Sequence, residues 1–233
     1  REVMNNQIQA LLDSVEQVIV GKRPVITRVV AALLCNGHVL IEDVPGVGKT
    51  QLAASLSRSL GGSFNRIQLT PDIMPSDVVG FSMVDQQTGK LEYRPGAAMC
   101  NFLLADEINR ASPKVQSSLL EVMEEYQISL DGQTRPLPRP FMVLATQNPV
   151  ETYGTYHLPE AQMDRFFMRV SIGYPSLQDE MDILGRYCGE QKPMESVVPV
   201  CSAEDVIAMQ QTVKTVYCSK EVRAYIAAIC AAT

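Results

Sequence analysis

Short apolar runs alternate along the chain with segments in which apolar residues recur at helical spacing. Five runs are strand candidates; they occupy residues 38–42, 64–69, 101–106, 141–146 and 166–172. Several of them are apolar at consecutive positions, as is typical of strands covered on both faces. Helical patterns occupy Lys49 to Leu60 and Ser112 to Tyr126, and the Ser-Pro pair that opens the second fits an N-cap and first helical residue. The alternation predicts an α/β fold with a five-stranded parallel sheet and helices on both faces.

Two segments interrupt this alternation. Residues 81–94 consist of two short alternating runs around Thr88-Gly89, and residues 126–138 consist of two more around Asp131-Gly132. Asp-Gly is a favoured pair for a two-residue turn between antiparallel strands. We predict a β-hairpin in each segment.

The strand-like runs stop near Tyr174, and the pattern that follows is helical. Gly and Pro within residues 173–176 mark a boundary, so we predict one unit over residues 1–173 and a smaller helical unit over residues 174–233. The last apolar residues keep helical spacing without a following cap or breaker; they are Val222, Tyr225, Ile226 and Ile229. We expect the helical unit to be incomplete in this sequence.

Composition narrows the class of protein. The 233 residues are 46% hydrophobic and carry a formal net charge of -6, which is ordinary for a globular protein and weighs against a surface built for duplex nucleic acid. Six cysteines without a C-x-x-C pair and two histidines disfavour a zinc site and indicate reduced thiols. The longest apolar run, Val29 to Cys35, is far shorter than the roughly 20 residues of a membrane span. We expect a cytoplasmic protein.

The segment VLIEDVPGVGKT, residues 39–50, joins a predicted strand to a predicted helix. Gly46 and Gly48 would let backbone N–H groups approach phosphates at the positive end of that helix. Lys49 would reach the β- and γ-phosphates, and the Thr50 hydroxyl would bind Mg²⁺. Asp43 stands where the phosphate-loop pattern has its first glycine, and a turn-forming role is a simpler interpretation of it than a catalytic one.

The strand over residues 101–106 ends in Asp106 and is followed by Glu107. The C-terminal ends of parallel strands meet at one edge of the sheet, where ligands bind. This placement predicts Asp106 as a second Mg²⁺ ligand and Glu107 as the group that polarises or orients the attacking water. A solvated strand end is the alternative for such a pair on its own.

Two later residues extend this candidate site. Asn148 closely follows the fourth predicted strand, where its amide could hold the water or the γ-phosphate, although Asn-Pro also initiates turns. Arg165 precedes the fifth strand and cannot easily reach the phosphates of its own chain. It could instead act on a neighbouring subunit as an arginine finger, with a surface Asp164-Arg165 pair as the alternative.

The motifs PGVGKT, LLADE, ATQNP and LPEAQMDRF occur in this order at the spacing of AAA+ ATPases. With the surrounding strings TPDIMPSDVVG and EINRASPKVQSSLLEVMEE, about residues 5–233 resemble the MoxR family of AAA+ ATPases, in which Asp at the first phosphate-loop position is tolerated. The resemblance implies an αβα sandwich followed by a small helical lid. It also implies that the two hairpins face the central pore or the partner of a ring.

The resemblance further implies ATP or ADP with Mg²⁺ as the bound cofactors. Nucleotide contacts would come from an adenine-pocket segment and from the phosphate loop, which comprise Val18, Ile19, Val20, Gly21, Pro45, Gly46, Val47, Gly48, Lys49, Thr50 and Gln51. Thr50 and Asp106 would hold the metal, and catalysis would use Glu107, Asn148 and, across a subunit interface, Arg165.

For partners, the resemblance implies a self-assembled ring, commonly a hexamer, that remodels or activates protein clients, often ones with von Willebrand factor A domains. The sensor-2 arginine of such lids would lie beyond Thr233, since Arg223 sits too early. A nucleic-acid motor is one alternative, disfavoured by the net charge of -6 and by the lack of a Lys/Arg run in either hairpin. A nucleotide-dependent scaffold is another, disfavoured by the intact Asp106-Glu107 pair.

Overall fold

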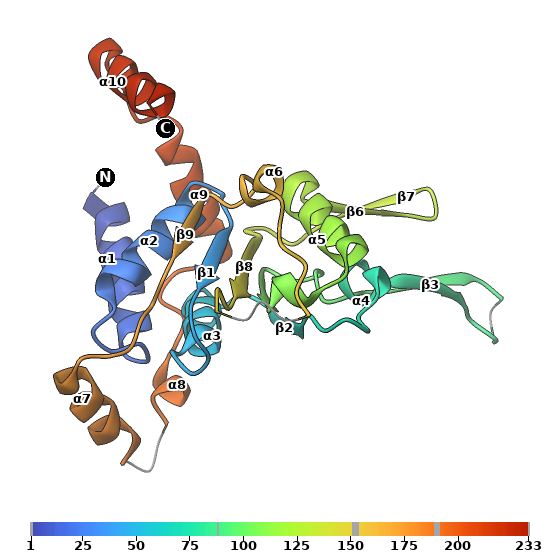
Figure 1. Ribbon diagram of the computed structural model, residues 1–233, viewed down its shortest axis with the longest axis horizontal. Coiled ribbons are helices and arrows are strands. Elements are labelled where there is room, and N and C mark those ends of the chain that lie inside the picture. The colour runs from blue at the N-terminus through green and yellow to red at the C-terminus, as the bar shows by residue number, and fades with distance from the viewer. Residues whose placement is uncertain (1, 88, 151–153, 189–191, 233) are drawn as a thin grey trace.

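A sheet of five parallel strands forms the centre of the computed structural model, which describes residues 2–87, 89–150, 154–188 and 192–232. Figure 1 shows the sheet, whose strand order is β2-β5-β8-β1-β9. The strands are β1 (Val39–Glu42), β2 (Phe64–Gln68), β5 (Phe102–Asp106), β8 (Met142–Gln147) and β9 (Met168–Val170). Each predicted run overlaps one of them, so the predicted parallel sheet is confirmed.

Helices cover both faces of this sheet. One face carries α1 (Glu2–Glu16), α2 (Arg23–Leu34) and α3 (Lys49–Ser59), and the other carries α4 (Pro75–Val79) and α5 (Pro113–Glu125). Successive strand residues point to opposite faces, so Val39 and Ile41 join the first core cluster and Leu40 joins the second. The layers form the expected αβα sandwich. Helices α3 and α5 match the two predicted helices, whereas α1 and α2 have no counterpart among the predicted elements.

Two hairpins project from the same side of the body (Figure 1). They pair β3 (Phe81–Val84) with β4 (Leu91–Arg94), and β6 (Gln127–Leu130) with β7 (Gln133–Pro136). Asp131 and Gly132, with φ of 52° and 70°, form the two-residue turn predicted for the second hairpin. Thr88, in the predicted turn of the first, lies outside the described residues. The Arg135 guanidinium lies 4.3 Å above the ring of Tyr93 and links the hairpins.

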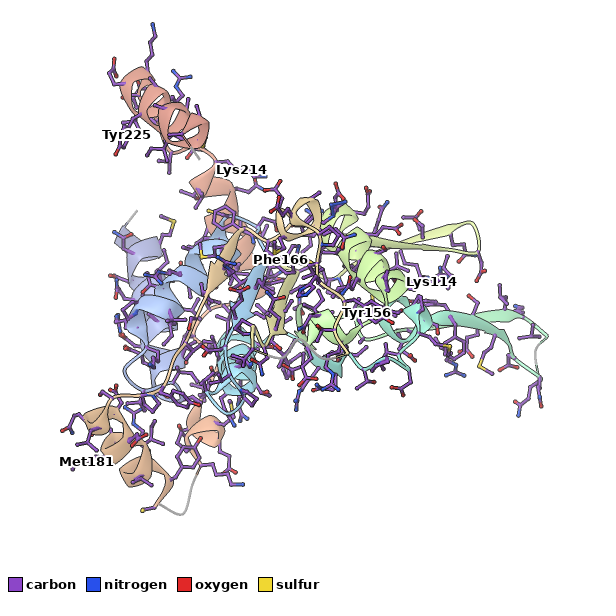
Figure 2. All side chains as sticks on the ribbon, viewed as in Figure 1. Lys114, Tyr156, Phe166, Met181, Lys214 and Tyr225 are labelled. Atoms are coloured by element: carbon purple, nitrogen blue, oxygen red, sulfur yellow. The ribbon has the colours of Figure 1, made fainter. Side chains whose placement is uncertain are left out.

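The chain leaves the sheet through β9, which follows the short helix α6 (Glu160–Met163). After β9, the described residues form α7 (Leu177–Tyr187), α8 (Pro193–Ser196), α9 (Ala203–Val213) and α10 (Lys220–Ala231). Figure 2 shows that Met181 on α7 and Tyr225 on α10 lie far apart, at the lower left and the upper left of the view. Both side chains are exposed. Within the described residues, no helix is long and apolar enough to cross a membrane.

Helix α9 packs back onto the sheet unit. The Gln210 side chain donates to the Leu33 carbonyl on α2 at 2.8 Å, and Val206 and Met209 are buried in the core cluster on that face. Part of the predicted helical unit therefore shares a core with the sheet. The division into residues 1–173 and 174–233 stays a prediction.

His38, the residue before β1, is buried between the sheet and α5, with 3% of its surface exposed. Its Nδ1 accepts the Val143 N–H at 2.9 Å, so Nε2 carries the proton and donates to the Met123 carbonyl at 3.0 Å. Protonation of Nδ1 would break the first bond and place a charge in the core. Burial accordingly lowers the pKa of His38 from 6.5 to about 4.

The burial of His38 makes the free energy of unfolding depend on pH. Because the folded-state pKa of His38 is depressed, the unfolded chain binds the extra proton, and stability is lost as the pH falls from about 6.5 towards 4. We expect the free energy of unfolding to fall by about 3 kcal/mol more in the wild type than in His38→Gln over this window. Urea unfolding at intervals between pH 7 and pH 4 measures the difference. If the free energy of unfolding fell equally with pH in both proteins, His38 would not be the cause of the loss of stability in acid.

Candidate functional site

The loop between β1 and α3 adopts, at two positions, a backbone that glycine accommodates without strain. Gly46 and Gly48 have φ of 88° and 94°, and Gly48 is the N-cap of α3. The first N–H groups of α3 have no intrahelical acceptor and can bind an anion. Lys49 Nζ donates to the carbonyl oxygens of Asp43 at 3.0 Å and Val44 at 3.4 Å. The lysine side chain therefore folds back against its own loop.

A cavity of about 330 Å³ lies beside this loop, at the C-terminal ends of the strands. The loop and the start of α3 contribute Pro45, Gly46, Gly48, Lys49, Thr50 and Gln51 to its lining. Asp106, Glu107 and Asn148 line it from the ends of β5 and β8. The structure thus brings the predicted phosphate loop, the acidic pair and Asn148 into one space.

Asp106 is held by two neighbouring strands and is 6% exposed. Its Oδ1 accepts the Thr146 hydroxyl at 3.0 Å, and its Oδ2 pairs with Arg66 Nε at 2.7 Å. Thr146 and Arg66 line the cavity too, and neither is among the predicted site residues. Both are polar residues on strands beside β5, which is the signal that could have pointed to them.

Glu107 has an unusual backbone. Its φ and ψ are 59° and 52°, a left-handed conformation that costs a non-glycine residue about 1 to 3 kcal/mol. Its N–H donates to the Thr146 hydroxyl at 3.0 Å, and its carboxylate lies 3.4 Å from Arg110 Nη1 in the 3₁₀ turn Ile108–Arg110. The same threonine therefore fixes both acids of the pair relative to β8.

Asn148 makes a turn-forming contact and also lines the cavity. Its Oδ1 accepts the Val150 N–H at 3.1 Å, which is the turn-forming contact of an Asn-Pro segment. The residue also lines the cavity together with Glu107. The turn fixes the orientation of an amide group that already lies at the cavity wall.

The cavity fits a divalent cation that brings phosphate oxygens with it. Among the described residues, no cluster of three or more His, Cys, Asp or Glu side chains could hold a metal by itself. The Thr50 hydroxyl and the Asp106 carboxylate, however, line the same space. One or two protein oxygens completed by phosphate and water oxygens is the usual Mg²⁺ arrangement. The donor set therefore suits Mg²⁺ bound with a nucleotide.

A second cavity, of about 230 Å³, adjoins the other side of the phosphate loop. Val18, Ile19 and Val20 line it, as do Gly46, Val47, Gly48 and Gln51. Gly21 is not among its lining residues, whereas the adjacent Lys22 is. Ile183 and Tyr187 of α7 close it from the opposite side, and the sequence patterns do not point to either. The mainly apolar wall suits a flat aromatic base.

Arg165 lies apart from both cavities. Its Nη2 pairs with Glu124 Oε2 of α5 at 2.6 Å, beside a separate cavity of about 450 Å³ that also contains Asp164. The Arg165 and Glu124 side chains are 36% and 57% exposed. The structure therefore does not bring Arg165 to the acidic pair of its own chain.

The strand order and the loop between β1 and α3 define the P-loop AAA+ fold. Residues 38–168 match the family model described as ATPase family associated with various cellular activities (AAA). The crystal structure of a protein from Cytophaga hutchinsonii, assigned as an ATPase, superposes with a TM-score of 0.86 at 40% identity, covering 96% of this chain and 68% of that one.

Two curated relatives identify the family more closely. The chain is 50% identical over 218 residues to the uncharacterized protein YeaC of Bacillus subtilis, covering 94% of this chain and 68% of YeaC. It is 44% identical over 204 residues to Chaperone MoxR1 of Mycobacterium tuberculosis, covering 88% of this chain and 53% of MoxR1. The chain therefore belongs to the MoxR family of AAA+ ATPases, and it spans about half the length of MoxR1.

Proposed function

We propose that the chain binds ATP with Mg²⁺ and hydrolyses the bond between the β- and γ-phosphates. The observation that carries this proposal is the shared cavity, in which the phosphate loop, Asp106, Glu107 and Asn148 surround about 330 Å³. Membership of an ATPase family supports the same substrate. The adjoining apolar cavity beside Val18 and Tyr187 would hold the adenine.

Each residue has a role that follows from its position. Lys49 and the N–H groups at the start of α3 would hold the β- and γ-phosphates. Thr50 and Asp106 would hold Mg²⁺, which neutralises charge on the phosphate oxygens. Water would attack the γ-phosphorus while its proton passes to the Glu107 carboxylate, and Asn148 would orient that water. The bond to the β–γ bridging oxygen breaks, and ADP and inorganic phosphate result.

We further propose that the working form is a hexameric ring in which Arg165 completes the site of the adjacent subunit. Arg165 lies outside the phosphate cavity of its own chain, which supports a site shared between adjacent subunits. A guanidinium supplied from a neighbour stabilises the charge that moves during phosphoryl transfer.

We propose that protein clients, rather than nucleic acid, use the energy of this cycle, and that they include proteins with von Willebrand factor A domains. The hairpin of β3 and β4 supports a protein partner because it exposes four large apolar side chains, with Phe81, Met83, Val84 and Leu91 all at least 44% exposed. A cytoplasmic location is part of this proposal and rests on the composition.

Replacing Lys49 tests the nucleotide site. We expect Lys49→Ala to weaken ATP binding at least tenfold and to abolish measurable ATP hydrolysis, because the lysine contacts the phosphates in both the bound and the reacting state. Calorimetry and phosphate release measure the two effects. Lys114→Ala is the matched control, since Lys114 (labelled in Figure 2) is an exposed residue of α5 that does not line the cavity. Equal ATP binding by the two variants would contradict the proposed site, and DNA-stimulated hydrolysis in the wild type would favour a nucleic-acid motor.

A further inference from the structure

Asp43 occupies the first position of the phosphate loop, directly after β1. Its N–H donates to the Gln147 carbonyl of β8 at 3.2 Å, and its own carbonyl accepts Lys49 Nζ at 3.0 Å. The main chain of Asp43 is thus joined both to the sheet and to the loop lysine.

The Asp43 carboxylate makes a different set of contacts. Its Oδ2 accepts the N–H groups of Ile172 at 2.6 Å and Gly173 at 2.8 Å, and the Ser171 hydroxyl at 3.1 Å. The residue is 8% exposed, so the buried charge is compensated by these donors. Because the carboxylate is engaged with this segment and is absent from the lining of the phosphate cavity, it need not repel a bound phosphate.

The segment held by Asp43 leads directly into the base cavity. Gly173 turns the chain with φ of 67° and lines that cavity. Ser176 then caps α7, whose Ile183 and Tyr187 close the cavity. Asp43 therefore lies where the phosphate half and the base half of the candidate site are joined.

A turn-forming role does not account for these contacts. The local contact, from the Val44 N–H to Oδ1, is 3.2 Å long. The three bonds to Oδ2 come from residues 128 to 130 positions further along the chain. A glycine at this position would keep the loop backbone but could make none of the three.

We propose that Asp43 is a positioning residue that sets the base cavity, and the start of α7, relative to the phosphate loop. The proposal rests on the proposed nucleotide-binding function and names a residue that acts through others and touches no substrate. A nucleotide bridges the two cavities, so its affinity depends on their separation and relative orientation. A ligand that occupies the phosphate cavity alone does not depend on them.

Two variants and two ligands test this proposal on the chain itself. Asp43→Gly removes the carboxylate and supplies the residue that phosphate loops ordinarily carry; Asp43→Asn keeps the shape and removes the charge. We expect both to weaken ADP binding about tenfold or more, and to change pyrophosphate binding by less than about twofold, by calorimetry with Mg²⁺. Ser171→Ala, which loses the longest of the three bonds, is the graded control and should change ADP binding least.

Hydrogen exchange without any ligand gives a readout that is independent of nucleotide. The Ile172 and Gly173 amides should exchange about tenfold faster or more in Asp43→Asn than in the wild type, with amides of β5 unchanged. Unchanged exchange at both amides would overturn the proposal. An equal loss of ADP and pyrophosphate binding would overturn it as well, because Asp43 would then act on the loop itself. If the wild type bound neither ligand, the proposed function would fail, while the exchange rates would still decide whether Asp43 holds the start of α7.

Discussion

Replacing Glu107 with glutamine is expected to leave ATP binding intact and to lower ATP hydrolysis by about 10² to 10⁴-fold. Glutamine has the shape of glutamate but its amide cannot accept the proton of the attacking water. The N–H of residue 107, which donates to the Thr146 hydroxyl, is unchanged by the substitution. The residue should therefore keep its left-handed backbone, and the loss should be confined to the chemical step.

Single-turnover phosphate release, combined with calorimetry of ATP binding, separates the chemical step from binding. We expect the ATP dissociation constant of Glu107→Gln to stay within about threefold of the wild-type value. Glu125→Gln is the matched control, because it makes the same chemical change at an exposed position on α5. Wild-type turnover in Glu107→Gln would refute the assignment of Glu107 as the water-polarising group.

The centre of the sheet could be predicted from the sequence because strands β1, β5 and β8 are buried on both faces. Runs such as residues 101–106 are apolar at consecutive positions, and β5 is fully buried along its length. Helix α2 (Arg23–Leu34) is harder to predict for a related reason. Val29 to Cys35 reads as an apolar run, and its helical face is defined only by the sheet and α9 that it packs against.

The phosphate half of the candidate site could also be predicted, because local motifs encode it. The loop and the acidic pair each occupy a few consecutive residues, and the parallel sheet brings them together. Arg66 could not be predicted in the same way, because its 2.7 Å pairing with Asp106 depends on the register between β2 and β5.

The base half of the site depends still more on tertiary structure. Ile183 and Tyr187 belong to a helix with no motif, and they reach the cavity only because the chain turns at Gly173. Asp43 illustrates the same limit, since its partners lie 128 to 130 residues away. In the sequence, Asp43 looks like a defect in the phosphate-loop motif. In the structure, its buried carboxylate accepts three hydrogen bonds from residues 171–173.

Replacing Arg165 with alanine is expected to lower ATP hydrolysis by about 10³ to 10⁵-fold in the assembled protein while leaving ATP affinity nearly unchanged. In the isolated chain Arg165 is paired with Glu124, and the two side chains are 36% and 57% exposed. Such exposed ion pairs contribute only about 0 to 1 kcal/mol. The arginine can therefore exchange this partner for the phosphates of a neighbouring subunit at little cost. Glu124→Gln is the matched control and should retain hydrolysis, because it removes the resting partner and leaves the guanidinium in place.

A mixing experiment distinguishes a shared site from a role within one chain. Arg165→Ala subunits keep the nucleotide cavity, and Lys49→Ala subunits keep the arginine, so each is inactive alone. In rings assembled from equal amounts, about a quarter of the interfaces should join an intact cavity to an intact arginine, and hydrolysis should return in that proportion. If mixed rings form, as sizing and cross-linking would show, and hydrolysis does not return, then Arg165 does not act across the interface. Its effect would then have to pass through α5, where Glu124 lies, and Glu124→Gln would be expected to share the defect of Arg165→Ala.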